Sequence, residues 1–183
     1  SAAEGVCGSG RPGGQGRAMA FDPVTVAPDP RYPAEVVVLL STLGAKRAEL
    51  HSGRRACDLL EIKRARHRVL DLNRDTHQGC SAVEEQALRT LTARGQLLRG
   101  DDNELILPQV FIDGQRVGDA ESLQFLEDEG ALEGVLLRQA CPGCRARRRT
   151  PECSQCAHCW ERFDEVLPDS AAGRRSPECA QLP

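Results

Sequence analysis

The order of predicted elements indicates a mixed α/β sandwich that is followed by a small metal-binding module. Strand and helix patterns alternate as a βαβ half and then a ββα half, which is the order of one mixed sheet covered by helices. An Asp-Gly pair separates two of the β-runs, as in a tight hairpin. Five of the nine cysteines lie within residues 141–159, with the two-residue gaps that metal knuckles use.

The first half of the sandwich is expected to hold a strand, a helix, a strand and a helix, over residues 35–40, 54–66, 68–72 and 81–94. The first strand, Glu-Val-Val-Val-Leu-Leu, is apolar on both faces, as in a buried central strand. A loop is predicted over residues 41–53, because Gly44 and Gly53 interrupt the pattern. Ser81 and Glu84 have the spacing of a capping box at the second helix.

The second half is expected to hold two strands and a helix, over residues 107–112, 115–117 and 119–130, and then a few helical turns over residues 131–138. Asp113-Gly114 predicts a type I′ turn, in which both central residues have positive φ. Asp119 can cap the last helix, and Gly130 can end it.

Composition divides the chain into four parts. A Gly/Pro-rich disordered tail is expected over residues 1–33, the α/β domain over 34–138, the cysteine-rich module over 139–163 and a flexible tail over 164–183. No apolar run approaches the length of a membrane span, and the net charge of −3 gives no general attraction to nucleic acid. Clustered cysteines are typical of a reducing compartment, so we expect an intracellular protein, in the cytoplasm or associated with the cytoskeleton. Targeting to an organelle is left open.

The cysteine cluster predicts one structural zinc ion. Each Cys-x-x-Cys turn presents two thiolates, and two such turns close a tetrahedron. The pair-of-pairs pattern assigns the four ligands to Cys141, Cys144, Cys153 and Cys156, with Cys159 or His158 as an alternative ligand. Because so short a segment has little apolar content, the metal would supply its stability. An iron–sulfur cluster, disulfides and free thiols are the alternatives.

Four arginines make this module basic: Arg145, Arg147, Arg148 and Arg149. They suit either a nucleic acid or an acidic protein surface. With few aromatic residues available for stacking on bases, we favour internal charge pairing or a protein partner that binds the module.

The run Leu-Pro-Gln-Val-Phe-Ile-Asp-Gly-Gln-Arg-Val-Gly, residues 107–118, resembles a glutaredoxin, and the resemblance extends over residues 35–137. Together with the cysteine-rich segment, it is similar to the glutaredoxin-domain cysteine-rich group of plants and animals. The resemblance implies a thioredoxin-like sandwich, with a four-stranded mixed sheet and a C-terminal zinc knuckle.

The resemblance also implies a glutathione site. Leu107 and the cis proline Pro108 would pair with the glutathione backbone. The start of the last helix would hold a glutathione carboxylate, on the backbone of Gly118, Asp119, Glu121 and Ser122. Asp119 departs from the family pattern and places a negative charge beside this carboxylate, so we expect weak binding.

The redox position departs further, because Arg54-Arg55-Ala56-Cys57 stands where the family has Cys-Pro-Tyr-Cys. Cys57 near a helix start, preceded by two arginines, would have a lowered pKa and could act as the single attacking thiol. Arg54 and Arg55 would then contact a glutathione carboxylate. The alternative is that Cys57 is a structural residue.

Three functions fit these patterns. The first is a diverged glutaredoxin-like binding or scaffold protein, with weak or no thiol–disulfide activity and a zinc-stabilised module. The second is a glutathione-linked monothiol oxidoreductase that uses Cys57. The third is a zinc-dependent holdase, by analogy with chaperone modules. The missing Cys-x-x-Cys at the redox position favours the first.

Overall fold

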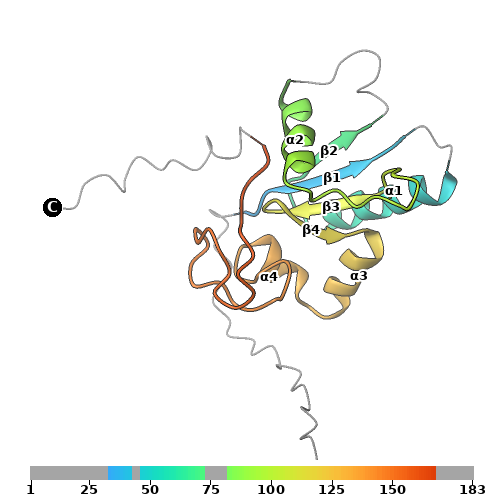
Figure 1. Cartoon of the computed structure of the whole chain (residues 1–183). Helices are drawn as coiled ribbons and strands as arrows, with labels where there is room; N and C mark the ends of the chain where they lie inside the picture. Colours follow the sequence, from blue (N-terminus) through green and yellow to red (C-terminus); the bar gives the residue numbers. More distant parts are fainter. Residues whose placement is uncertain (1–32, 43–45, 73–81, 168–183) are drawn as a thin grey trace, which may run out of the picture.

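The computed structural model describes residues 33–42, 46–72 and 82–167. Four strands and four helices follow one another in the predicted order (Figure 1): β1 (Val36–Leu40), α1 (Arg47–Ile62), β2 (Arg68–Asp71), α2 (Ala82–Ala93), β3 (Gln109–Ile112), β4 (Gln115–Gly118), α3 (Ala120–Asp128) and α4 (Leu132–Leu136). The predicted tail over residues 1–32 lies outside the described residues, and so do Cys7, Cys80 and Cys179.

The strands form one mixed sheet in the order β2-β1-β3-β4. β1 runs parallel to β2 and antiparallel to β3, and β3 pairs with β4 in the predicted hairpin. α1 therefore forms the crossover that joins the two parallel strands. The expected sandwich of a βαβ half and a ββα half is confirmed.

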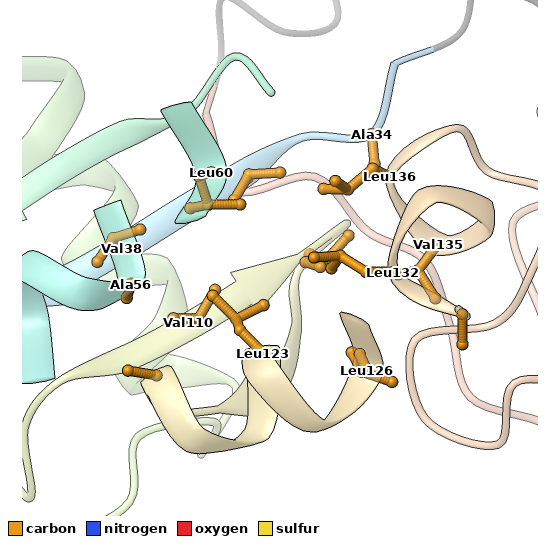
Figure 2. Packing of buried hydrophobic residues seen from close by; sticks show 14 of the residues in the cluster. Ala34, Val38, Ala56, Leu60, Val110, Leu123, Leu126, Leu132, Val135 and Leu136 are labelled. Carbon is orange, nitrogen blue, oxygen red and sulfur yellow. The ribbon is translucent and has the colours of Figure 1, made fainter. Parts of the chain in front are cut away.

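β1 is buried on both faces because helices cover both sides of the sheet (Figure 1). Val38 and Leu40 face a core that they share with Ala56 and Leu60 of α1 and with side chains of α3 and α4. Figure 2 shows this packing. The alternate residues Val37 and Leu39 face a second core, whose helical side is α2. The run of five apolar residues in β1 thus serves two cores at once.

The first helix begins earlier than the sequence indicated. α1 starts at Arg47, so its first two turns occupy residues that were expected to form a loop. Gly53 does not break the helix, because it is buried where α1 crosses the sheet. A Cβ atom there would lie 3.4 Å from Leu40 and 3.9 Å from Pro108. Cys57 is consequently an interior residue of the helix, not one near its start.

The hairpin and the last long helix match their predictions. Asp113 and Gly114 have φ values of 49° and 76°, as a type I′ turn requires. The Leu107–Pro108 peptide bond is cis. Asp119 caps α3, because its Oδ1 accepts a hydrogen bond from the backbone N–H of Ser122 at 3.0 Å. Gly130, with φ of 68°, follows the end of that helix.

Residues 164–167, which we call the strap, correct one predicted boundary. The sequence assigned them to a flexible tail, but Val166 and Leu167 are buried in the second core beside Leu91 and Phe111. In Figure 1 the strap rises from the cysteine-rich module towards α2. Two consecutive apolar side chains with a place in a core are the reason that this segment is packed. Within the described part of the chain, no helix combines the length and apolar character that a membrane crossing needs.

Candidate metal centre

Four cysteine sulfurs converge at one point after α4. The Sγ atoms of Cys141, Cys144, Cys156 and Cys159 all lie within 4.8 Å of one another. Two of the separations, Cys141 to Cys159 and Cys144 to Cys156, are 3.6 Å. Ligands 2.3 Å from a tetrahedral zinc ion stand about 3.8 Å apart, so this donor set fits such an ion. All four cysteines are free thiols.

The cluster is built from two copies of one knuckle, fifteen residues apart. Cys141 N–H donates to Ala146 O at 2.9 Å, and Cys156 N–H donates to Glu161 O at 2.8 Å. Isolated bridges join Ala140 to Arg147 in the first copy, and Gln155 to Arg162 in the second. Each Cys-x-x-Cys turn therefore sits at the tip of a short antiparallel loop, and the two tips face one another.

The residue after each turn has left-handed backbone geometry. Arg145 has φ of 62° and Trp160 has φ of 65°, and each donates its N–H to the carbonyl of the first cysteine of its own turn. Glycine adopts this conformation at little cost, whereas an arginine or a tryptophan there is strained. The surrounding knuckle must hold both residues in place.

Cys153 is a correction to the predicted ligand set. Its sulfur is not in the converging group, and Cys159, named above only as an alternative ligand, takes its place. In the fifteen-residue repeat Cys153 corresponds to Arg138, which precedes the first knuckle, so it lies before the second turn instead of in it. The predicted pairing used the nearest cysteines along the chain. The sequence signal that this pairing missed was the spacing of fifteen residues between the turn Cys141-x-x-Cys144 and the turn Cys156-x-x-Cys159.

His158, the other alternative ligand, is exposed and contributes through its backbone. Its N–H donates to Cys156 Sγ at 3.3 Å. Burial opposes ionisation of this thiol, but N–H donation from Cys159 and His158 outweighs it and lowers the pKa of Cys156 to about 6. Burial raises the pKa of the Cys141 and Cys144 thiols. Four thiolates would fill a tetrahedron without leaving a position for water, so the site suits a structural ion.

Cys57 does not have the environment that the sequence suggested. It is the eleventh residue of α1, about 15 Å along the helix axis from Arg47, and the positive end of the helix dipole acts only on the first turn. Burial raises the pKa of the Cys57 thiol, and Glu61 and Asp58 add to this effect. The expected lowering of the pKa of Cys57 is therefore wrong, and its half-buried side chain packs against the first core.

Arg54 and Arg55 are exposed on α1. Gly53 of this helix lies against Pro108. Because successive helical residues are turned by about 100°, Arg55 lies nearly opposite Gly53. Arg55 thus lies on the side of α1 away from the cis proline with which the resemblance would group it.

The start of α3 is occupied by the protein's own carboxylate. Asp119 Oδ1 accepts from both the N–H and the hydroxyl of Ser122, each at 3.0 Å. Although burial opposes it, this hydrogen bonding lowers the pKa of Asp119. Gly118, with φ of 137°, approaches so closely that a Cβ atom would lie 2.2 Å from Ser122 Oγ. Glu121 is exposed on the same turn. An added anion would have to compete with Asp119 for these donors.

The basic residues of the module are partly neutralised within the chain. Arg145 pairs with Glu129 and lies 5.1 Å from the ring centroid of Phe125. Arg148 pairs with Asp113 at 2.7 Å in the protein interior. Arg147 and Arg149 are exposed. Internal charge pairing thus accounts for two of the four arginines that the sequence singled out.

Comparisons with known proteins found similarity only among solved structures, since neither the scan of family models nor the search of curated proteins gave a match. The buckwheat glutaredoxin–glutathione complex is 20% identical, with 58% of this chain and 79% of that chain covered, at a TM-score of 0.37. The holo form of glutaredoxin C1 from Populus tremula x tremuloides is also 20% identical, with 64% and 86% covered, at 0.37. A dithiolic glutaredoxin from Trypanosoma brucei brucei is 23% identical, with 58% and 90% covered, at 0.37.

None of these three is described as cysteine-rich, so the resemblance to that narrower group stays a prediction. The fold itself follows from the strand order and the placement of the helices. The described residues therefore have the fold of a glutaredoxin, a thioredoxin-like sandwich, which is followed by a four-cysteine knuckle able to hold a metal ion.

Proposed function

We propose that this chain is a non-catalytic binding protein, in which a glutaredoxin-type domain and one structural zinc ion present a surface to a protein partner. The observation that carries the proposal is the redox position. Residues 41–46, which join β1 to α1, read Ser-Thr-Leu-Gly-Ala-Lys and contain no cysteine. The nearest cysteine, Cys57, is ten residues into the helix and has a raised pKa. A thiol in that state is a poor nucleophile at neutral pH.

Zinc is the ion that best suits the four-thiolate donor set, because it accepts tetrahedral thiolate coordination without redox change. Reduced cysteines are a condition for such a site, which supports a reducing intracellular compartment.

The surface of the module supports a protein partner. Trp160 is 70% exposed and Phe125 is 51% exposed, although large aromatic side chains are usually covered. A cavity of about 370 Å³ lies between α3 and the first knuckle, where it is lined by Phe125, Pro142 and Arg145, among others. Aromatic and arginine side chains around a concavity are typical of sites that take an anchoring side chain of a partner.

The catalytic alternative is tested by a glutathione-dependent disulfide reductase assay on the full chain. We expect wild type and Cys57→Ser to give the same rate, close to that of glutathione alone. Cys144→Ser is unsuitable as a control, because it would disturb the metal site. Ser154→Ala is a better control for a change in the cysteine-rich module, since Ser154 is exposed and the substitution removes only one hydroxyl group. A wild-type rate well above background that Cys57→Ser abolishes would establish the oxidoreductase instead.

The partner surface is tested by placing a photo-crosslinking amino acid at Trp160 and, separately, at Ile62. Both positions are exposed and apolar, but Ile62 is the last residue of α1 and does not belong to the module. We expect one defined adduct from position 160 that is lost when excess wild-type chain competes. The same adduct from position 62, or no competition at position 160, would contradict the proposed surface.

A further inference from the structure

The cysteine-rich module, residues 139–163, is fixed to the domain at both of its ends. At its start, Leu136 O accepts a hydrogen bond from Ala34 N–H at 2.8 Å, just before β1. At its end, the strap places Val166 and Leu167 in the second core, on the opposite face of the sheet from α1 and α3. The module is therefore a closed loop between two packed segments, not a terminal appendage.

The strap is held by hydrogen bonds as well as by its apolar side chains. The carboxylate of Glu35 accepts the N–H of Val166 at 2.6 Å and that of Leu167 at 2.8 Å. From the end of α2, Arg94 donates to Asp164 O at 2.8 Å. The hairpin turn lies so close that a Cβ atom at Gly114 would be 1.9 Å from Asp164 O. Elements from both halves of the domain thus contact the strap.

A buried ion-pair network joins the hairpin to the module. Asp113, whose side chain is 1% exposed, contacts Arg138 through Oδ1 at 2.5 Å and Arg148 through Oδ2 at 2.7 Å. Arg138 also reaches Glu165 of the strap at 2.5 Å. The same Oδ1 accepts the backbone N–H of Glu35 at 3.0 Å. One carboxylate on the β3–β4 turn thereby connects the residue before β1 with the start of the module and its first knuckle and, through Arg138, with the strap.

This network continues to the metal ligands. The guanidinium of Arg148 lies 3.7 Å from the ring centroid of Phe163, and the two residues occupy the same position in the two copies of the knuckle. Phe163 in turn packs in one apolar cluster with Cys141 and Cys156. A continuous set of contacts therefore runs from the four thiols through Phe163 and Arg148 to Asp113 and the sheet.

We propose that metal binding at the four cysteines is coupled to the stability of the sheet through Asp113, Arg148 and the strap, so that the ion acts as a conformational switch for the whole domain. This inference rests on the proposed metal site. When the ion leaves, the knuckles lose their shared centre, Arg148 loses its support on Phe163, and the strap is released from the second core.

Coupling between two processes is reciprocal. If the folded sheet raises the metal affinity of the module by some factor, the bound metal raises the folding equilibrium of the sheet by the same factor. Allosteric coupling factors are typically about 5 to 150. Given a buried two-arginine network and two core side chains, we expect at least about a tenfold effect here.

The experiment measures amide hydrogen exchange in the full chain, with zinc at saturation and after zinc is removed by a chelator under reducing conditions. The readout is the protection of amides in β1 and β3, which lie outside the module. We expect zinc to increase this protection at least about tenfold. In Arg148→Met, which removes the charged guanidinium and keeps an unbranched apolar stem, zinc should increase this protection less than about threefold, and the zinc dissociation constant should rise by the lost factor.

Zinc content is measured on the same samples, which distinguishes failure of the proposed metal site from failure of the proposed coupling to the sheet. If no zinc binds at one per chain, the proposed metal site fails. If one zinc binds and the protection of β1 and β3 is unchanged by its removal, the metal site stands and the coupling is refuted. That wild-type comparison needs no variant, so it remains decisive if Arg148→Met does not fold. Cys153→Ser, a matched change outside the ligand set, should keep the full zinc-dependent increase, and its loss in this variant would also refute the assignment.

Discussion

Replacing Asp113 with asparagine is expected to be the most informative single change in the sheet. Asparagine has nearly the same volume and tolerates the positive φ of 49° at this turn position. Its carbonyl oxygen can still accept a hydrogen bond from Glu35 N–H. The substitution therefore removes one negative charge from between two buried guanidinium groups while leaving the turn intact.

The expected loss of folding free energy in Asp113→Asn follows from the contacts that the two arginines keep. Arg138 keeps its contact with Glu165, whereas Arg148 is left with Ala140 O and the ring of Phe163. Removing one partner of a buried pair costs about 3–5 kcal/mol, and we take about 3 because Arg138 is still compensated. For a domain of this size, that corresponds to a fall in melting temperature of roughly 10 °C.

The assay is urea and thermal unfolding of the full chain with one zinc bound. Asp101→Asn is the matched control, because it makes the same chemical change at an exposed position, where we expect less than about 0.5 kcal/mol. If Asp113→Asn is no more destabilising than Asp101→Asn, the network contributes nothing to stability and the reasoning from its burial is wrong.

Three further outcomes follow from the sites. Cys159→Ser should abolish stoichiometric zinc binding and change the fluorescence of Trp160, the only tryptophan, whereas Cys153→Ser should leave zinc binding and fluorescence unchanged. The reverse result would restore the ligand set predicted from the sequence. Because burial raises the pKa of Cys57, iodoacetamide should alkylate its thiol at pH 7 more slowly than a cysteine in the urea-unfolded chain, and the rate should still rise with pH above the ordinary ionisation range of a thiol. A Cys57 rate at pH 7 equal to that of the unfolded chain would contradict this environment. Glutathione should bind in the millimolar range, about −4 kcal/mol, and Asp119→Gly should tighten binding about two- to fivefold by removing a like charge; unchanged affinity would show that the carboxylate does not compete.

Local patterns were sufficient for most of the domain. The apolar run of β1 predicted a central strand, because apolar side chains on both faces of a strand indicate that neither face is exposed to solvent. Asp113-Gly114 predicted the hairpin, because few residue pairs accept positive φ in succession. Asp119 predicted the cap of α3, since the side chain and the amide that it satisfies are only three residues apart. In each case the cause and the effect lie within a few residues of one another.

The start of α1 was not predictable in this way. Gly53 has the local character of a helix breaker, and its meaning changes only when Leu40 and Pro108 are brought against it. Close packing of the helix on the sheet favours a residue without a side chain, and this outweighs the cost of glycine in a helix, about 1 kcal/mol. The position of Cys57, and with it the pKa of its thiol, depended on that tertiary contact.

By itself, the sequence determined the order of the elements, the hairpin, the helix cap and the presence of a cysteine cluster that could hold a metal ion. Tertiary structure decided which four cysteines converge, because only the packing of two equivalent knuckles brings Cys159 to the centre and leaves Cys153 outside it. It also gave Asp113 a second role: besides forming the turn, this residue is the buried partner of two arginines that follow it by 25 and 35 positions in the chain. Turn and cap preferences act over three or four residues, whereas a charge buried between distant segments is defined only once the chain has closed around it.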